Sequence, residues 1–116
     1  MALSSRNQLI SDGKKHLTKL IFDTLKTISF DIENFGLKNN KIKYFELKLL
    51  KSGFEKVNYI KVLKEESLSE LDSTPSRCRI FISITIDGVR LIDNISLKRL
   101  LVKQKDLIKI MKIEGN

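Results

Sequence analysis

This sequence is poor in the residues that build most metal-binding and catalytic sites. It has one cysteine, Cys78, and one histidine, His16. A single cysteine cannot close a disulfide within the chain, and one cysteine far from one histidine matches no zinc-binding spacing. The sequence also has no calcium-loop pattern, Walker phosphate loop or G-x-G-x-x-G turn. We therefore expect no metal site and no complete catalytic centre, with Cys78 as a small buried hydrophobe and His16 as a solvated helix residue.

Long apolar stretches are missing as well. No run reaches the roughly 18 apolar residues of a membrane span, and the start of the chain lacks the charged and apolar regions of a signal peptide. We therefore expect a cytoplasmic protein with no membrane contact. With 116 residues, 41% of them hydrophobic, the chain can form one domain with a modest core.

The chain has an excess of positive charge. The chain has 22 Lys and Arg against 14 Asp and Glu, a formal net charge of +8. Such a balance favours polyanionic partners through long-range attraction. The lysines are spread along the whole sequence, however, and form no block of like charges. Solvated helix faces explain them at least as well as a nucleic-acid site does.

The first half of the chain predicts two helices. Ser11 or Asp12 can cap the first, and Asn34 with Gly36 can end it. Its apolar residues recur at three- and four-residue spacing: Leu17, Leu20, Ile21, Leu25, Ile28 and Ile32. A second helix ends at Gly53, and its apolar face comprises Ile42, Phe45, Leu49 and Leu50.

The second half predicts a three-stranded antiparallel sheet. Residues 57–63 are rich in β-branched and aromatic residues, and Leu68 with Leu71 should tuck a short turn under the sheet. An isoleucine-rich alternation over 79–86 reaches Asp-Gly, which suits a type I′ hairpin turn into a strand at 89–93. The isoleucine face should be core.

The last segment, 97–116, predicts a basic amphipathic helix capped by Ser96. Its apolar stripe would consist of Leu97, Leu100, Leu101, Leu107, Ile108 and Met111. Such a helix can rest on a membrane surface, close the domain core or pack on another subunit, and the last two are favoured. The predicted fold is therefore α+β, with two helices packed on a small three-stranded antiparallel sheet, plus a C-terminal helix.

The first ten residues predict an ordered loop or loose arm that is suited to phosphate. Ser4, Ser5 and Arg6 stand just before the first helix, followed by Asn7. Serine hydroxyls and exposed backbone N–H groups donate hydrogen bonds, and the arginine fork matches phosphate oxygens. As an isolated motif, this combination has little specificity.

Three segments together resemble the C-terminal domain of the pantothenate synthetases (pantoate–β-alanine ligases). They are Leu-Ser-Ser-Arg-Asn at 3–7, Lys-Ser-Gly-Phe at 51–54 before the first strand, and Arg-Leu-Ile-Asp-Asn at 90–94 after the Asp-Gly turn. The similarity in order and spacing runs from Ala2 to about Ser96. It implies three parts: a phosphate-contacting arm at 1–10, a lid domain at 11–96 and an additional helix at 97–116, to which the resemblance gives no role.

The resemblance implies one half of an ATP-dependent ligase of the coenzyme A pathway. That family adenylates pantoate and transfers the acyl group to β-alanine. By resemblance, Ser4, Ser5 and Arg6 would contact the ATP phosphates, Leu3 would lie beside the nucleotide, and Arg6 would be catalytic. Mg²⁺ is expected with ATP in this family, although this chain offers no metal ligands of its own.

The family's N-terminal nucleotide-binding domain, with its H-x-G-H motif, has no counterpart in this sequence. We therefore expect the chain alone to be inactive and to need that domain as its partner. The segment 90–94 is expected to have a structural role, fixing hairpin register and terminal hydrogen bonds.

Two other classes of function stay open. A small basic RNA-binding module is suggested by the charge and by the Phe and Tyr residues, although most of the phenylalanines fall on or near predicted buried faces. A protein-interaction subunit, either a homodimer or a chain that docks to a separate N-terminal domain, is the third reading.

Overall fold

The computed structural model describes residues 16–104 and 107–111. They form two helices and six strands, which are α1 His16–Phe35, β1 Leu37–Lys38, α2 Asn39–Lys51, β2 Lys56–Lys64, β3 Cys78–Ile86, β4 Val89–Ser96, β5 Leu100–Gln104 and β6 Leu107–Met111. Strands β2, β3 and β4 form one antiparallel sheet in that order, and β1, β6 and β5 form a second, smaller one. The predicted α+β class is confirmed.

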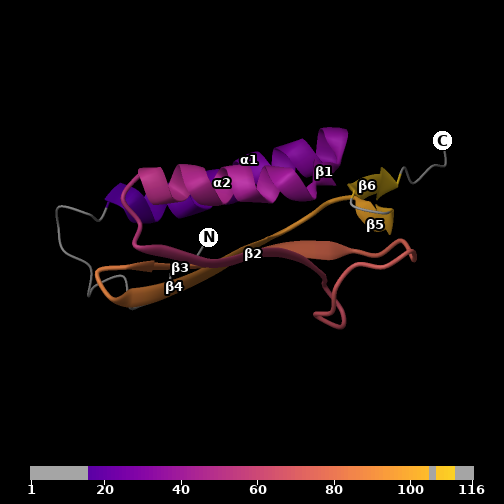
Figure 1. The fold of residues 1–116 in the computed structure, drawn as a ribbon. Coiled ribbons are helices and arrows are strands. Elements are labelled where there is room, and N and C mark those ends of the chain that lie inside the picture. The colour runs from indigo at the N-terminus through magenta and orange to yellow at the C-terminus, as the bar shows by residue number, and fades with distance from the viewer. Residues whose placement is uncertain (1–15, 105–106, 112–116) are drawn as a thin grey trace.

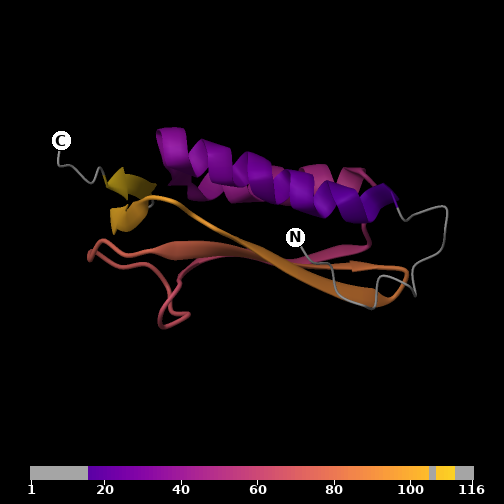
Figure 2. The same cartoon turned by 180° about the vertical axis from the view of Figure 1, so that it is seen from behind.

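The two helices lie side by side over one face of the larger sheet, and no helix of the described residues covers its other face (Figures 1 and 2). Helix α1 follows the predicted spacing, because its buried apolar residues stand on one stripe: Leu17, Ile21, Leu25, Ile28 and Ile32. Its predicted cap at Ser11 or Asp12 lies outside the described residues. In α2, Phe45 and Leu49 are buried as expected, but Leu50 turns out of the predicted stripe and is 40% exposed.

The central strand of the larger sheet is β3, and its alternation decides how the two layers pack. All four isoleucines of the predicted core face, Ile80, Ile82, Ile84 and Ile86, are fully buried. Asp87 and Gly88 have φ angles of 53° and 72°, both positive, as a type I′ turn requires. The predicted hairpin is therefore confirmed, although β4 extends further than the predicted 89–93.

The connection between β2 and β3 is partly as predicted. Leu71 is buried and joins the core, whereas Leu68 is 59% exposed and adopts a positive φ of 57°. The expectation that both leucines tuck under the sheet is thus wrong for Leu68. A residue in a left-handed turn conformation points where the turn directs it, and hydrophobicity does not decide this position.

The predicted C-terminal helix at 97–116 is wrong for the described part of that segment. Strands β5 and β6 pair antiparallel, and β6 also pairs with β1, where Leu37 lies opposite Ile108. Short apolar runs fit a strand as well as a helix. Strand pairing decides between them, since β6 pairs with β1 and β5 pairs with β6, and Leu101 and Ile108 belong to the same core as the buried residues of the helices. Ser96, the predicted helix cap, is instead the last residue of β4.

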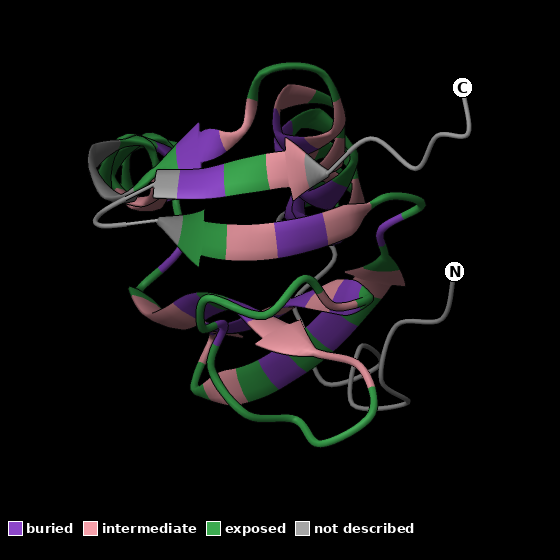
Figure 3. Cartoon of the chain, turned by 90° about the vertical axis from the view of Figure 1, so that its right-hand side faces the viewer, coloured by how far each residue is buried: buried purple, intermediate pink, exposed green. Residues whose placement is uncertain are grey.

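A glycine allows β6 to approach the end of α1. Gly36 has a φ of 76° and closes the helix with a 3.0 Å hydrogen bond from its N–H to the Ile32 carbonyl. A Cβ atom at this position would lie 2.5 Å from the backbone oxygen of Ile108. Figure 3 shows the small sheet next to the larger one, with buried and exposed residues alternating along the strands.

Candidate functional site

The residues predicted to bind ATP, namely Ser4, Ser5 and Arg6 at the phosphates and Leu3 beside the nucleotide, lie outside the described residues. The described part instead contains the third segment of the resemblance, 90–94, together with the sheet that carries it. Polar side chains form two groups on the face of that sheet that points away from the helices, and Asp93 lies on the opposite face.

The face of the β2–β3–β4 sheet that points away from the helices is called the outer face here. The register of the two strand pairs assigns to it Tyr59, Lys61, Arg79, Phe81, Ser83, Thr85, Arg90, Ile92, Asn94 and Ser96. Several of these residues are held in fixed hydrogen bonds.

Arg79 is the centre of the first group. Its Nη2 and Nε atoms lie 2.9 Å and 3.2 Å from Oε2 of Glu65, and its Nη1 lies 2.6 Å from Oδ1 of Asn94. Ser96 adds a hydroxyl donor to the same glutamate oxygen at 3.2 Å. This arrangement ties the end of β2 to β4 across the central strand, so Arg79 is already engaged within the domain.

Ser83 is the centre of the second group and is completely buried although it lies on the outer face. Its hydroxyl accepts hydrogen bonds from Nε of Arg90 at 2.8 Å and from Nδ2 of Asn58 at 3.1 Å. Asn58 can reach it because the β2–β3 register shifts between Val57 and Tyr59, and such a bulge redirects a side chain. These bonds agree with the expected structural role of Arg90.

Asp93 lies on the opposite, helix-facing side of the same sheet. Its Cα pairs with that of Ile82, so its side chain belongs to the face of Leu91 and the buried isoleucines, and it is only 4% exposed. Burial raises the pKa of this carboxyl above its ordinary value, and the backbone N–H of Asn94 opposes that shift. Sequence reasoning missed this burial, although the alternation from Val89 through Leu91 to Asp93 already placed the three residues on one face.

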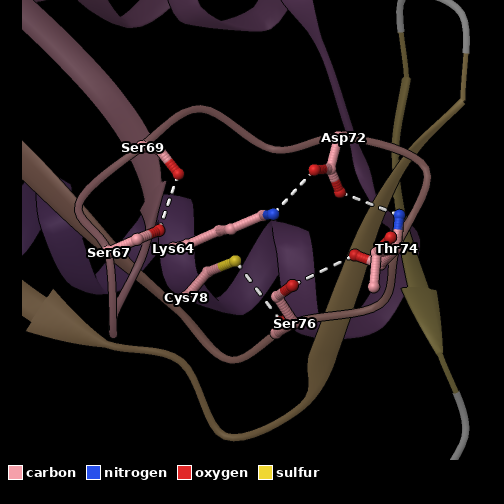
Figure 4. A network of polar contacts seen from close by, with 7 residues as sticks. All are labelled: Lys64, Ser67, Ser69, Asp72, Thr74, Ser76 and Cys78. Atoms are coloured by element: carbon pink, nitrogen blue, oxygen red, sulfur yellow. Dashed lines mark hydrogen bonds and ion pairs between the residues drawn. The ribbon is translucent and has the colours of Figure 1, made fainter.

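The loop between β2 and β3 holds a further polar network (Figure 4). Asp72 accepts a hydrogen bond from Nζ of Lys64 at 2.7 Å and from the backbone N–H of Thr74 at 2.9 Å, and both contacts lower the pKa of this carboxyl. Nearby, the thiol of Cys78 donates to the Ser76 carbonyl at 3.4 Å. Burial raises the pKa of Cys78 to about 11, so the thiol stays protonated and is a poor nucleophile.

Within residues 16–104 and 107–111, no group of three or more His, Cys, Asp and Glu side chains is placed to hold a metal ion. In the same part of the chain, no helix is long and apolar enough to cross a membrane.

Comparison with known proteins gives a family. The model of the family described as pantoate-beta-alanine ligase matches residues 1–96. The chain is 31% identical over 97 residues to a pantothenate synthetase of Hydrogenovibrio crunogenus, covering 82% of this chain and 34% of that protein. It is 25% identical over 97 residues to the pantothenate synthetase of Dinoroseobacter shibae, again with 34% of that protein covered. The chain is also 31% identical over 104 residues to a pantothenate synthetase of Wigglesworthia glossinidia brevipalpis, and the match covers 36% of that protein.

The chain thus spans about a third of the length of the curated relatives it matches. The family match includes both residues 3–7 and residues 90–94, the two outer segments on which the resemblance rests, and extends over more than half of the sequence. The chain therefore belongs to the pantoate–beta-alanine ligase family.

Proposed function

We propose that this chain is the C-terminal, ATP-covering domain of a pantothenate synthetase. In that reaction the carboxylate of pantoate attacks the α-phosphorus of ATP and pyrophosphate leaves. The amine of β-alanine then attacks the acyl carbon, which forms the amide of pantothenate and releases AMP.

The contribution of this chain would come from its first residues. Ser4 and Ser5 would donate hydrogen bonds to the ATP phosphates, and Leu3 would lie beside the nucleotide. Arg6 would be the catalytic residue, because its permanent charge stabilises the negative charge that builds on the α-phosphate and on the leaving pyrophosphate. Closure of this domain over its partner would exclude water from the acyl adenylate. Mg²⁺ would arrive with ATP, bound by phosphate oxygens and the partner domain.

The observation that carries this proposal is the family match to residues 1–96, in a chain that covers only about a third of the length of its relatives. The one thiol of the described residues, Cys78, is buried and protonated, and Arg79 and Arg90 both donate to side chains of the sheet. The remaining chemistry would then belong to the N-terminal nucleotide-binding domain, with pantoate and β-alanine bound there.

Substitution of Arg6 tests the phosphate role directly. Loss of one such donor costs on the order of 3 kcal/mol of transition-state stabilisation, or roughly a hundredfold in rate. AMP release by the chain mixed with a separately expressed N-terminal domain should fall by about that factor in Arg6→Ala. The matched control is Arg99→Ala, an exposed arginine beyond the family match, which should leave the rate unchanged. Equal rates for both variants would contradict the role of Arg6.

Two exposed aromatic side chains on helix α1 favour contact with another protein surface. Phe30 and Phe35 are 61% and 78% exposed and pack edge to face, with 6.4 Å between their ring centroids. Exposed aromatic pairs of this kind are typical of interaction sites. Either the N-terminal domain or a second copy of the chain would cover them. Sedimentation at high concentration separates the two, since a strict monomer removes the homodimer.

Binding of single-stranded RNA is a second candidate, favoured by one feature of the outer face. Tyr59 and Lys61 lie on it together, with the ammonium 5.4 Å from the ring centroid, and Phe81 pairs with Lys61 on the next strand. Aromatic rings beside cations on an open sheet can stack bases. RNA binding that weakens steeply with salt and is lost in Tyr59→Ala would support it. Salt-independent or absent binding would remove it.

A further inference from the structure

A cavity of about 200 Å³ lies along strand β2, where the larger sheet meets the smaller one. The small sheet and the loop after β2 lie at the same end of the molecule (Figure 1). Among the described strands β2 has one neighbour, β3, and near its end Leu63 lies opposite Glu70 on the other edge. Two residues further on, the carbonyl of Asp72 accepts a hydrogen bond from the N–H of Lys103 in β5 at 2.9 Å. Residues 70–72 thus connect the edge of β2 to the small sheet, and Glu70 and Leu71 line the cavity.

Most of the cavity wall is aliphatic. It comprises Ile42 of α2, Ile60, Val62 and Leu63 of β2, Leu71, and Ile108 of β6. A cavity of about 150 Å³ with such a lining holds a benzene molecule, so one of about 200 Å³ has room for about eight or nine non-hydrogen atoms. The cavity therefore suits a small molecule with a branched aliphatic group.

Charged residues of both signs complete the lining. The Cα of Lys103 pairs with that of Ile108, which belongs to the core, so Lys103 stands on the core-facing side of the small sheet. Glu70 lines the cavity from the connecting segment, and both residues are exposed at its mouth. Lys61 also lines it, but its ammonium lies over the ring of Tyr59, 5.4 Å from the centroid. One cation and one carboxylate thus remain to face a ligand, and a ligand with both charges complements them.

The edge of β2 adds backbone donors. In an antiparallel strand, successive N–H groups point to opposite edges. The N–H of Glu65 donates to the Arg77 carbonyl on the side of β3, whereas that of Lys64 donates to the Ser69 carbonyl on the other side. By this alternation, Ile60 and Val62 direct their N–H groups to the same edge as Lys64, and both line the cavity. Such an edge can bind the main-chain groups of an amino acid or extended peptide.

We propose that this cavity binds a free aliphatic α-amino acid. Its side chain would lie among the aliphatic residues, its carboxylate would meet Lys103 and the N–H groups of β2, and its ammonium would meet Glu70. Valine, leucine and isoleucine fall within the size that the cavity admits. A peptide is too large for it, and an apolar acid without an ammonium leaves Glu70 without an opposite charge. This site is separate from the ATP-contacting role and involves none of its residues.

Titration of the intact chain with leucine, followed by amide NMR, tests the site in the absence of ATP. Saturable shifts at the amides of Ile60, Val62 and Lys103 should reach half their maximum below about 10 mM. Isocaproate, which is leucine without its ammonium, and isoamylamine, which is leucine without its carboxylate, should each bind at least about tenfold more weakly. These two ligands test the charge requirement on the unsubstituted chain.

Substitution of the two charged residues tests their roles separately. Lys103→Met and Glu70→Gln keep the length of the side chains and should each weaken leucine binding at least about tenfold. The matched controls are Lys109→Met, on the opposite face of β6, and Glu66→Gln, in the same loop as Glu70, and both should leave binding unchanged. All four residues are exposed, so the variants should keep the fold. Absence of saturable shifts, equal affinity for isocaproate and leucine, or unchanged binding in Lys103→Met would each overturn the proposal.

Discussion

The close approach of Gly36 to β6 yields a prediction about strands β5 and β6, where the sequence pattern predicted a helix. Alanine at position 36 would adopt a φ of 76° and place its Cβ 2.5 Å from the Ile108 carbonyl oxygen. The left-handed conformation costs a residue with a Cβ about 1–2 kcal/mol. The clash forces a backbone shift, and overpacking of this kind costs typically about 1–3 kcal/mol more. Gly36→Ala should therefore lower the free energy of unfolding by about 2–5 kcal/mol.

Gly88 provides the matched control, because its φ is 72° and a Cβ there would meet nothing within 4 Å. Gly88→Ala should cost only the conformational part, about 1–2 kcal/mol. Urea unfolding followed by circular dichroism measures both, and the chain has no tryptophan to report by fluorescence. In a chain shortened to residues 1–99, which lacks β5 and β6, the two variants should become equal. Equal losses in the complete chain would refute the packing of β6 on the end of α1.

Two further predictions concern the core. Ile84→Ala should lower the free energy of unfolding by about 2–5 kcal/mol, because its side chain is fully buried, whereas Ile92→Ala, 47% exposed on the outer face, should cost less than about 1 kcal/mol. Similar losses in urea titrations would contradict the assignment of the two faces. The pKa of the Cys78 thiol is raised from its ordinary value of 9.0 to about 11 in the folded chain. As the pH rises, the unfolded chain therefore loses this proton before the folded chain does. The stability that comes from the protonated thiol should therefore be complete below pH 9 and disappear between pH 9 and 11. Cys78→Ala should remove this part of the pH dependence, and an unchanged profile in that variant would refute the cause.

Helix α1 and the β3–β4 hairpin could be predicted from the sequence, because in each the local residue pattern agrees with the fold around it. The six-residue stripe of α1 allows one period only, and Asp87-Gly88 has the turn chemistry that a type I′ hairpin needs. Both follow from backbone geometry alone, so no knowledge of distant contacts was required.

The tail and the helix-facing carboxylate could not be predicted in the same way. Leu100, Leu101 and Ile108 fit a helical stripe and a strand equally well, and the choice depends on pairing with β1, far away in sequence. The burial of the Asp93 carboxylate depends on which parts of the fold pack over it. The arm at 1–10, with Leu3, Ser4, Ser5 and Arg6, stays a prediction, as do the lid domain at 11–96 and its dependence on a partner.

The central claim is that this chain completes an active site that it cannot form alone. Release of AMP from ATP, pantoate and β-alanine, measured for the chain alone, for a separately expressed N-terminal pantothenate synthetase domain alone, and for the two mixed, tests it most directly. The account predicts release well above the sum of the separate rates in the mixture and none from the chain alone. Turnover by the chain alone, or no gain in the mixture when the two pieces demonstrably bind, would contradict it.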